Sequence, residues 1–244
     1  MIQGAVSHPL QSAIAGTRHL LLPRICPACL ENLCASSERL CCSCKGTLEE
    51  LPLPRCKACG GTVDGALEVC SECLRLQQSR PWRHAVSVYP FRAGVRELVH
   101  RFKYNSHTYL APLMAQRMTE NWRQFGCHDV DCITAVPLHW TKQVTRGYNQ
   151  SHLLATRIAD ALDLPLFRLL KRKRHTAPQA MLDFSTRQTN MRGVFTPAGK
   201  QSCEGMHVLL IDDVMTTGAT LSAAAQCLRQ MKCASVNVLT IARG

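Results

Sequence analysis

Cysteine pairs at regular spacing are the first feature of this sequence that could do chemistry. Four C-x-x-C pairs stand in the first third of the chain, separated by 11, 11 and 10 residues. A two-residue gap lets both thiolates of a tight turn reach one ion, and tetrahedral zinc takes four thiolates. The eight cysteines therefore predict about two structural Zn²⁺ sites per chain. The predicted ligands are Cys26, Cys29, Cys41, Cys44, Cys56, Cys59, Cys70 and Cys73.

The spacing leaves the partition of these ligands open. Sequential pairing, first pair with second and third with fourth, is the simplest arrangement, and interleaved pairing would give a cross-brace with the same spacing. A redox role is the alternative for a single C-x-x-C pair, but redox pairs lie in a βαβ context and do not come in fours. Cys34 and Cys42 are left over, and only Cys41 keeps the two-residue gap to Cys44 that Cys42 lacks.

A second pattern, residues 208–221, joins an apolar run to two acids, a threonine–glycine loop and a helix-forming stretch. In open parallel sheets, ligands bind beyond the carboxyl ends of the strands. Free N–H groups ahead of a helix N-terminus bind phosphate, and Gly218 lets the backbone approach closely. The hydroxyls of Thr216, Thr217 and Thr220 add donors. This pattern predicts a phosphate-binding loop.

The two carboxylates beside that loop indicate that the ligand is a sugar phosphate. Asp212 and Asp213 directly precede the loop and could accept hydrogen bonds from ribose hydroxyls. The alternative is a plain strand–turn–helix junction with solvated acids and capping threonines. An acid pair alone would favour that alternative, whereas the whole string favours a site.

The elements that must position these residues alternate between strands and helices after about residue 82. Strands are expected over 84–89, 132–136, 205–213 and 236–242. Amphipathic helices are expected over 93–104, 108–125, 149–162 and 219–231. This alternation predicts an α/β fold with a parallel sheet covered on both faces.

Composition separates a cysteine-rich module from this α/β part. Ten of the fifteen cysteines lie between Cys26 and Cys73, a segment too short to bury a sizeable core. Metal–thiolate bonds must stabilise its fold instead. We expect an N-terminal lead segment (1–22), a double zinc ribbon (23–80) and an α/β domain (81–244).

Charge indicates polyanionic partners. The chain holds 29 Lys and Arg against 17 Asp and Glu, a net charge of +12. Residues 165–192 carry seven basic residues and one acid, which is half of that net charge. Nucleic acid or phosphorylated small molecules fit this excess, and solubilising charge is the plain alternative.

Hydropathy bears on the compartment. Apolar runs such as 208–211 are only a few residues long, so no membrane insertion is expected. Residues 1–16 contain neither a basic start nor a continuous apolar stretch, which argues against a secretory signal peptide. Clustered thiols favour a reducing compartment. We expect a cytoplasmic location.

Residues 208–221 resemble the phosphoribosyl diphosphate (PRPP) signature of type I phosphoribosyltransferases. Further motifs in the same order resemble the ComF/GntX family over nearly the full length. These motifs are Leu21–Cys29, Leu98–Tyr104, Val136–Leu138, Arg146–Gln150, and Arg174 with Thr176, Gln179, Arg187, Asn190 and Phe195. The resemblance implies a parallel-sheet type I phosphoribosyltransferase-like domain preceded by a small cysteine-rich double zinc ribbon.

The resemblance also assigns roles to residues. Asp212 and Asp213 are implied as catalytic. The implied PRPP phosphate- and ribose-binding residues are Thr216, Thr217, Gly218, Ala219 and Thr220. The candidates for diphosphate binding are Lys103, Pro137, Leu138, Arg146 and Arg174. By residue type alone, Arg146 could equally start a surface helix, Asn149 could cap one, and Lys103 could extend from a helix end.

The implied reaction is glycosyltransferase chemistry on PRPP bound with Mg²⁺, in which a base nitrogen displaces diphosphate at the ribose C1. Thr216 stands where purine-salvage relatives often carry an Asp that handles a base proton, so the acceptor is undefined. The family also implies a role in DNA uptake and competence or in nucleotide metabolism, with DNA-uptake proteins as partners. The alternative is a non-catalytic, PRPP-responsive protein that binds single-stranded DNA. Aromatic residues are only 5%, which argues against base stacking and for salt-sensitive, electrostatic binding.

Overall fold

The computed structural model describes most of the 244 residues. The described ranges are 25–26, 28–31, 33, 40–63, 67–75, 80–104, 107–173, 193–199 and 201–244. Contacts divide the chain into two compact units, Met1–Thr47 and Leu48–Gly244. The last four of the paired cysteines, Cys56, Cys59, Cys70 and Cys73, form the second group of cysteines. They therefore belong to the same compact unit as the sheet.

The first unit carries four of the eight paired cysteines, on a tight turn and at the start of a short helix. The Leu30 N–H donates to the Cys26 carbonyl at 2.7 Å, and Leu30 itself has φ 68°. Helix α2 (Cys42–Thr47) follows, and the Lys45 N–H donates to the Cys41 carbonyl at 2.9 Å. The turn and the start of α2 thus present the cysteines that the spacing singled out.

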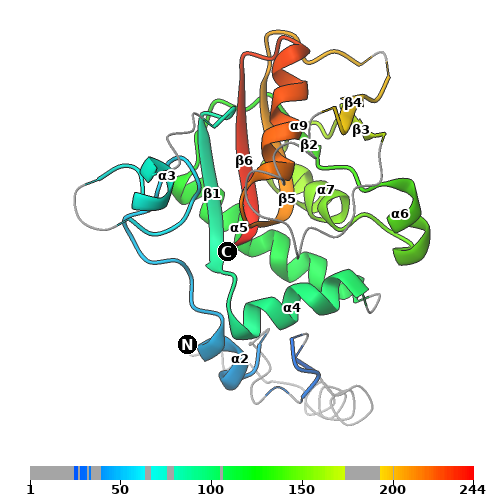
Figure 1. Ribbon diagram of the computed structural model, residues 1–244. Coiled ribbons are helices and arrows are strands. Elements are labelled where there is room, and N and C mark those ends of the chain that lie inside the picture. Colours follow the sequence, from blue (N-terminus) through cyan, green and yellow to red (C-terminus); the bar gives the residue numbers. More distant parts are fainter. Residues whose placement is uncertain are drawn as a thin grey trace, which may run out of the picture. The chain divides into compact units, whose positions relative to one another are not determined.

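The second unit is built on a four-stranded parallel sheet (Figure 1). Its order is β1 (His84–Pro90), β6 (Ser235–Arg243), β5 (His207–Met215) and β2 (Cys132–Ala135). Every residue of β6 is buried, as expected for a central strand with both faces covered. The expected α/β fold with a parallel sheet is confirmed.

Helices cover both faces of this sheet. Helix α5 (Ala111–Phe125) contacts β1 and β6, and α7 (Gln150–Leu162) contacts β5 and β2. Helix α9 (Ala219–Gln230) packs on β5 and β6 from the other side (Figure 1). Val208 and Leu210, which point to one face because strand side chains alternate, share a core with Leu228 of α9.

One expected helix, which follows α4 (Ala93–Tyr104), is divided. Residues 108–125 form a 3₁₀ turn, η1 (Thr108–Leu110), followed by α5. Pro112 lies in the first turn of α5, the only part of a helix that tolerates a residue without an N–H. The expectation of one continuous helix was therefore wrong by its first turn.

Further elements were absent from the sequence expectations. Helix α6 (Trp140–Arg146) ends at Gly147, which has φ +78°. Strands β3 (Leu170–Arg172) and β4 (Phe195–Pro197) form a small antiparallel pair. Helix α3 (Ser71–Arg75) carries the last cysteine of the second group.

The second group of cysteines contributes to the main core. Cys56, Cys59 and Cys73 are buried with Trp82 in the same hydrophobic cluster as the inner face of α9. The Ala85 N–H of β1 donates to the Lys57 carbonyl at 2.9 Å.

Among the described helices, none combines the length and hydropathy needed to cross a bilayer.

Candidate functional site

The acid pair lies at the carboxyl end of β5. Strand β2 stops at Ala135, which pairs with Ile211, so the next two residues of β5 project beyond the end of their neighbour. Asp212 and Asp213 are both buried, at 9% and 8% exposed. This is the position at which open parallel sheets bind ligands.

Asp212 is held by two donors. The Ser151 hydroxyl donates to Asp212 Oδ1 at 2.8 Å, and the Asp213 N–H donates to the same oxygen at 2.9 Å. Burial and the nearby charge of Asp213 raise the pKa of Asp212 to about 7. The carboxyl group is therefore fixed in orientation and is costly to ionise in the folded protein.

Asp213 is paired with a cation from another helix. Lys103 Nζ, in the last turn of α4, lies 3.0 Å from Asp213 Oδ2. The Gln150 side-chain amide donates to the Lys103 carbonyl at 3.3 Å, which ties α4 to the start of α7. The structure thus places Lys103, expected to bind diphosphate, directly at the acid pair.

The loop after β5 has the shape expected of a phosphate-binding turn. Residues 216–218 form a bend, and Gly218 caps α9 with φ +78°. The Ala219 N–H donates to Thr217 Oγ1 at 3.4 Å. The first N–H groups of an α-helix have no partner within the helix, and the helix dipole favours an anion there. Thr216 to Thr220 therefore form the turn after β5 and the first residues of α9.

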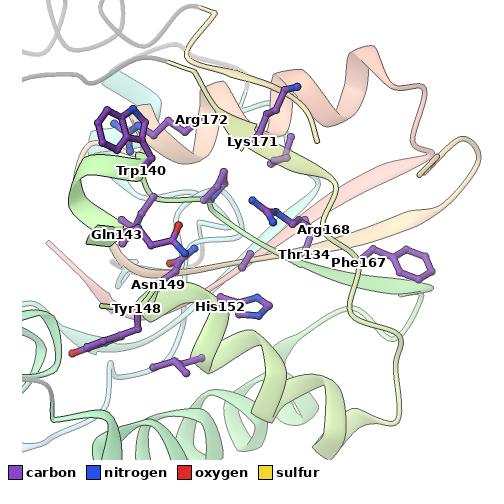
Figure 2. A pocket seen from close by; sticks show the side chains of 15 residues that line it. Thr134, Trp140, Gln143, Tyr148, Asn149, His152, Phe167, Arg168, Lys171 and Arg172 are labelled. Carbon is purple, nitrogen blue, oxygen red and sulfur yellow. The ribbon is translucent and has the colours of Figure 1, made fainter. Parts of the chain in front are cut away.

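A cavity of about 370 Å³ is lined by the end of β2, the start of α7 and residues of the segment 167–172 (Figure 2). Pro137 and Leu138 form part of its wall, directly after β2. Trp140, Arg168 and Lys171 also line it, and no carboxylate does among the described residues. A cavity with cationic walls and no acid fits an anionic ligand.

Arg172 is a further cation in the wall of this cavity. Its guanidinium lies 5.6 Å from the centre of the Phe195 ring. Burial lowers the pKa of Arg172, and the charge of Asp212 opposes that shift. Three cations, Arg168, Lys171 and Arg172, therefore line the cavity.

Two of the expected diphosphate ligands that the structure describes, Lys103 and Arg146, do not line this cavity. Arg146 donates to Gln150 Oε1 at 3.2 Å and to the Tyr104 hydroxyl at 3.1 Å, and it stacks over the Tyr104 ring. Arg174 lies outside the described residues. The capping interpretation of Asn149 is confirmed, because its side chain accepts from the Ser151 N–H at 3.1 Å.

The eight paired cysteines gather into two groups of four by sequential pairing. The groups are Cys26, Cys29, Cys41 and Cys44, and Cys56, Cys59, Cys70 and Cys73. In each group the sulfur atoms all lie within 4.8 Å of one another. Cys42 is exposed and belongs to neither group.

The donor geometry of both groups fits a tetrahedral metal. Sulfur atoms bound 2.3 Å from one zinc ion lie about 3.8 Å apart. The Cys59 and Cys70 sulfurs are 3.7 Å apart, and those of Cys29 and Cys41 are 3.5 Å apart. The Cys70 N–H points at the Cys56 sulfur at 3.3 Å, as expected for a thiolate acceptor. Both groups are compatible with structural zinc.

Three residues near the site were not predicted from the sequence. Ser151 follows the Asn149–Gln150 pair and reaches Asp212 only because α7 begins beside β5. Arg80 and Arg243 donate to the Thr217 and Thr216 carbonyls, respectively, in the turn after β5. Arg243 is a charged residue at the end of β6, a strand whose residues are all buried. Its place at the end of the expected strand was the one signal in the sequence that could have indicated it.

Comparison with known proteins agrees with the fold. Residues 149–244 match the family model of the phosphoribosyl transferase domain. With the parallel sheet and the acid–loop–helix sequence, this match places the protein in the phosphoribosyltransferase-like α/β class.

Full-length relatives define the family more closely. The chain is 30% identical to Competence protein F of Haemophilus influenzae over 224 residues, which cover 89% of this chain and 96% of that protein. It is 29% identical to DNA utilization protein YhgH of Salmonella typhimurium over 92% of this chain and 99% of that protein. It is also 29% identical to Competence protein ComFC of Bacillus subtilis, over 84% and 85% respectively. The chain belongs to the ComF/GntX family.

Proposed function

We propose that this protein binds PRPP with Mg²⁺ at the turn between β5 and α9 and transfers its phosphoribosyl group to a nitrogen acceptor. The observation that carries the proposal is the buried pair Asp212 and Asp213, placed near the carboxyl end of β5, which leads into a glycine turn and a helix N-terminus. That order supplies carboxylates for ribose hydroxyls and backbone N–H groups for the 5′-phosphate.

The cationic cavity supports a place for the leaving group. Arg168, Lys171 and Arg172 could neutralise the charge that develops on diphosphate as the bond from C1 to the diphosphate oxygen breaks. A bond from C1 to the acceptor nitrogen forms, and the acceptor loses its proton to solvent or to a side chain. Bound Mg²⁺ would supply further charge neutralisation on the diphosphate oxygens.

The zinc and compartment proposals follow from the cysteines. Two Cys₄ groups of matching geometry support two structural Zn²⁺ ions, since a site closed by four thiolates leaves no position for substrate. Thiolate ligands persist in a reducing compartment, which supports a cytoplasmic location. The names of the relatives support a role in the uptake or use of DNA.

Calorimetric titration tests the PRPP site. Mg²⁺–PRPP is titrated into the wild type and into the Asp212→Asn/Asp213→Asn variant, and diphosphate release is then followed with a panel of bases. Binding that is lost in the variant, with diphosphate released when a base is added, supports the transferase. Equal affinity of both proteins for PRPP would contradict the proposal that Asp212 and Asp213 belong to the PRPP site.

A second candidate function is favoured by one observation. Trp140 is 67% exposed and lines the same cavity as Arg168 and Lys171 (Figure 2). An exposed ring beside cations is the arrangement on which single-stranded DNA stacks. Binding without diphosphate release, across the panel of bases, would favour a PRPP-responsive protein that binds single-stranded DNA.

A further inference from the structure

Arg243 lies between the second cysteine group and the phosphate-binding turn. It is the last residue of β6 and is 8% exposed. Its Nη1 donates to the Thr216 carbonyl at 2.8 Å, and its Nη2 lies 2.9 Å from Glu72 Oε2. Glu72 stands between Cys70 and Cys73 in the chain. One guanidinium therefore joins the metal-ligating segment to the first residue of the turn.

Arg80 makes a second connection of the same kind. Its Nη1 donates to the Thr217 carbonyl at 2.9 Å, and its guanidinium lies 5.3 Å from the centre of the Trp82 ring. The Trp82 indole donates to the Ala58 carbonyl at 2.7 Å. Ala58 stands between Cys56 and Cys59, so this path also begins within the cysteine group.

Both arginines lie close to a glycine. A methyl group at Gly61 would lie at ordinary contact distance, 3.4 Å from the Cys59 sulfur and 3.6 Å from Cγ of Arg243. A methyl group at Gly218 would lie 2.6 Å from Nη1 of Arg80, so the end of that side chain would have to shift. The Arg80 guanidinium therefore packs directly against the turn.

The two arginines fix the direction of the peptide groups in the turn. A trans peptide group is planar, so its N–H points away from its own carbonyl. With the Thr216 and Thr217 carbonyls bonded to arginines, the N–H groups of Thr217 and Gly218 point to the opposite side. These are donors that a phosphate bound at this turn would need.

We infer that the second cysteine group is the platform that positions the phosphate-binding turn, so that metal binding at this group and anion binding at the turn are thermodynamically linked through Arg243 and Arg80. The inference rests on the proposed function, which identifies the anion as PRPP. Linkage is reciprocal: a metal that holds the turn in place strengthens PRPP binding, and PRPP retains the metal. Arg243 and Arg80 act here as positioning residues.

The experiment measures zinc release from the zinc-loaded, full-length protein to a chromogenic chelator, with and without Mg²⁺–PRPP. PRPP is expected to slow the release of one of the two zinc equivalents at least threefold and to leave the other unchanged. The Asp212→Asn/Asp213→Asn variant controls for zinc binding by PRPP itself. Calorimetry on the same samples gives PRPP affinity.

Variants separate positioning from general stability. Arg243→Met and Arg80→Met are each expected to weaken PRPP about tenfold and to abolish the retention of zinc. Arg243→Lys keeps the charge and is expected to recover part of both effects. Arg55→Met is the matched control, because Arg55 is also largely buried beside the cysteine group but donates to the Leu51 carbonyl and to Asn121. It should leave the linkage intact.

The outcomes distinguish this inference from the proposed function. If the wild type binds PRPP but zinc release does not respond, and both arginine variants bind PRPP normally, the inference is overturned and the proposed function stands. If the wild type binds no PRPP, the proposed function fails, and the same release assay with inorganic diphosphate decides the linkage. If Arg243→Met does not fold, the partly exposed Arg80 carries the test.

Discussion

Lys103 of α4 and Asp213 of β5 form an ion pair at 3.0 Å, with side chains 24% and 11% exposed. Removing one partner of such a pair leaves an uncompensated, mostly buried charge, whereas removing both does not. Lys103→Met is therefore expected to lower the free energy of unfolding by roughly 2–4 kcal/mol. The Lys103→Met/Asp213→Asn double variant is expected to recover most of that loss.

Urea unfolding of the wild type, both single variants and the double variant measures this coupling. Arg101→Met is a suitable control, because Arg101 pairs with the exposed Glu97 in the same helix. It is expected to change stability by less than about 1 kcal/mol. Additive effects of Lys103→Met and Asp213→Asn would show that the ion pair does not stabilise the fold.

The raised pKa of Asp212 predicts how stability changes with pH. Its folded-state pKa of about 7 lies above its ordinary 3.8, so its contribution is fully present below about pH 4 and is lost as pH rises to about 7. Asp212→Asn keeps an oxygen acceptor for Ser151 and carries no charge. The variant should therefore be more stable than the wild type, with a gap that widens by roughly 1–3 kcal/mol between pH 5 and pH 7.5.

Unfolding of the two proteins at several pH values checks this prediction, because the difference between them cancels the contributions of all other carboxylates. The same variant is expected to lose PRPP binding. A gap that stays constant with pH would mean that Asp212 ionises as easily in the folded protein as in the unfolded chain.

The strands and helices that frame the site could be predicted because their sequence patterns are local. The apolar run at 208–211 and the Asp–Asp–loop–helix order identify β5, the turn and α9 without reference to any other part of the chain. In the same way, the local C-x-x-C spacing identifies the eight cysteines as candidate metal ligands. Helix α6 was missed because its exposed residues, such as Trp140 and Val144, give no core-facing stripe.

The residues that complete the site could not be predicted, because they depend on contacts between distant segments. Ser151 is 61 residues from Asp212, and Arg80 is 137 residues from Thr217. Composition separates a cysteine-rich module ending near residue 80, whereas contacts separate the chain after Thr47. The boundary from composition depends only on where the cysteines stand in the sequence. The boundary from contacts differs because Cys56, Cys59 and Cys73 pack against the main core.

Gly218 and Gly147 allow a matched test of the phosphate-binding turn. Both have φ +78°, so alanine costs about 1–2 kcal/mol of backbone strain at either position. Only at Gly218 would the new methyl group meet a neighbour, Arg80 Nη1 at 2.6 Å, since nothing lies within 4 Å of the site at Gly147. Gly218→Ala is expected to weaken PRPP binding about tenfold or more, and Gly147→Ala to leave it unchanged. Equal affinity for PRPP in both variants would contradict a close-fitting turn.

Metal content provides a separate test of the cysteine groups. Elemental analysis of freshly purified, reduced protein should give about two zinc ions per chain, as expected for eight paired thiolates. Cys29→Ser/Cys44→Ser and Cys59→Ser/Cys70→Ser should each remove one ion. The second pair of substitutions should destabilise the α/β unit more, because its group packs into the main core. Protein without zinc that folds and unfolds normally would contradict a structural metal.

Trp140 offers a direct probe of nucleic-acid binding. The sequence argued against stacking on the basis of few aromatic residues, but Trp140 is 67% exposed and lies beside a cationic cavity. The other two tryptophans, Trp82 and Trp122, are buried at 6% and 4% exposed. An oligothymidylate is therefore expected to quench mainly the emission of Trp140.

The quenching should be absent in Trp140→Phe, and Arg168→Glu should weaken DNA binding at least tenfold at low salt. Affinity should fall as salt rises, because phosphate contacts release counterions. Addition of Mg²⁺–PRPP distinguishes two arrangements: competition would mean that DNA and diphosphate share the cavity, and simultaneous binding would place them apart. Quenching that persists in Trp140→Phe would show that DNA binds elsewhere on the protein.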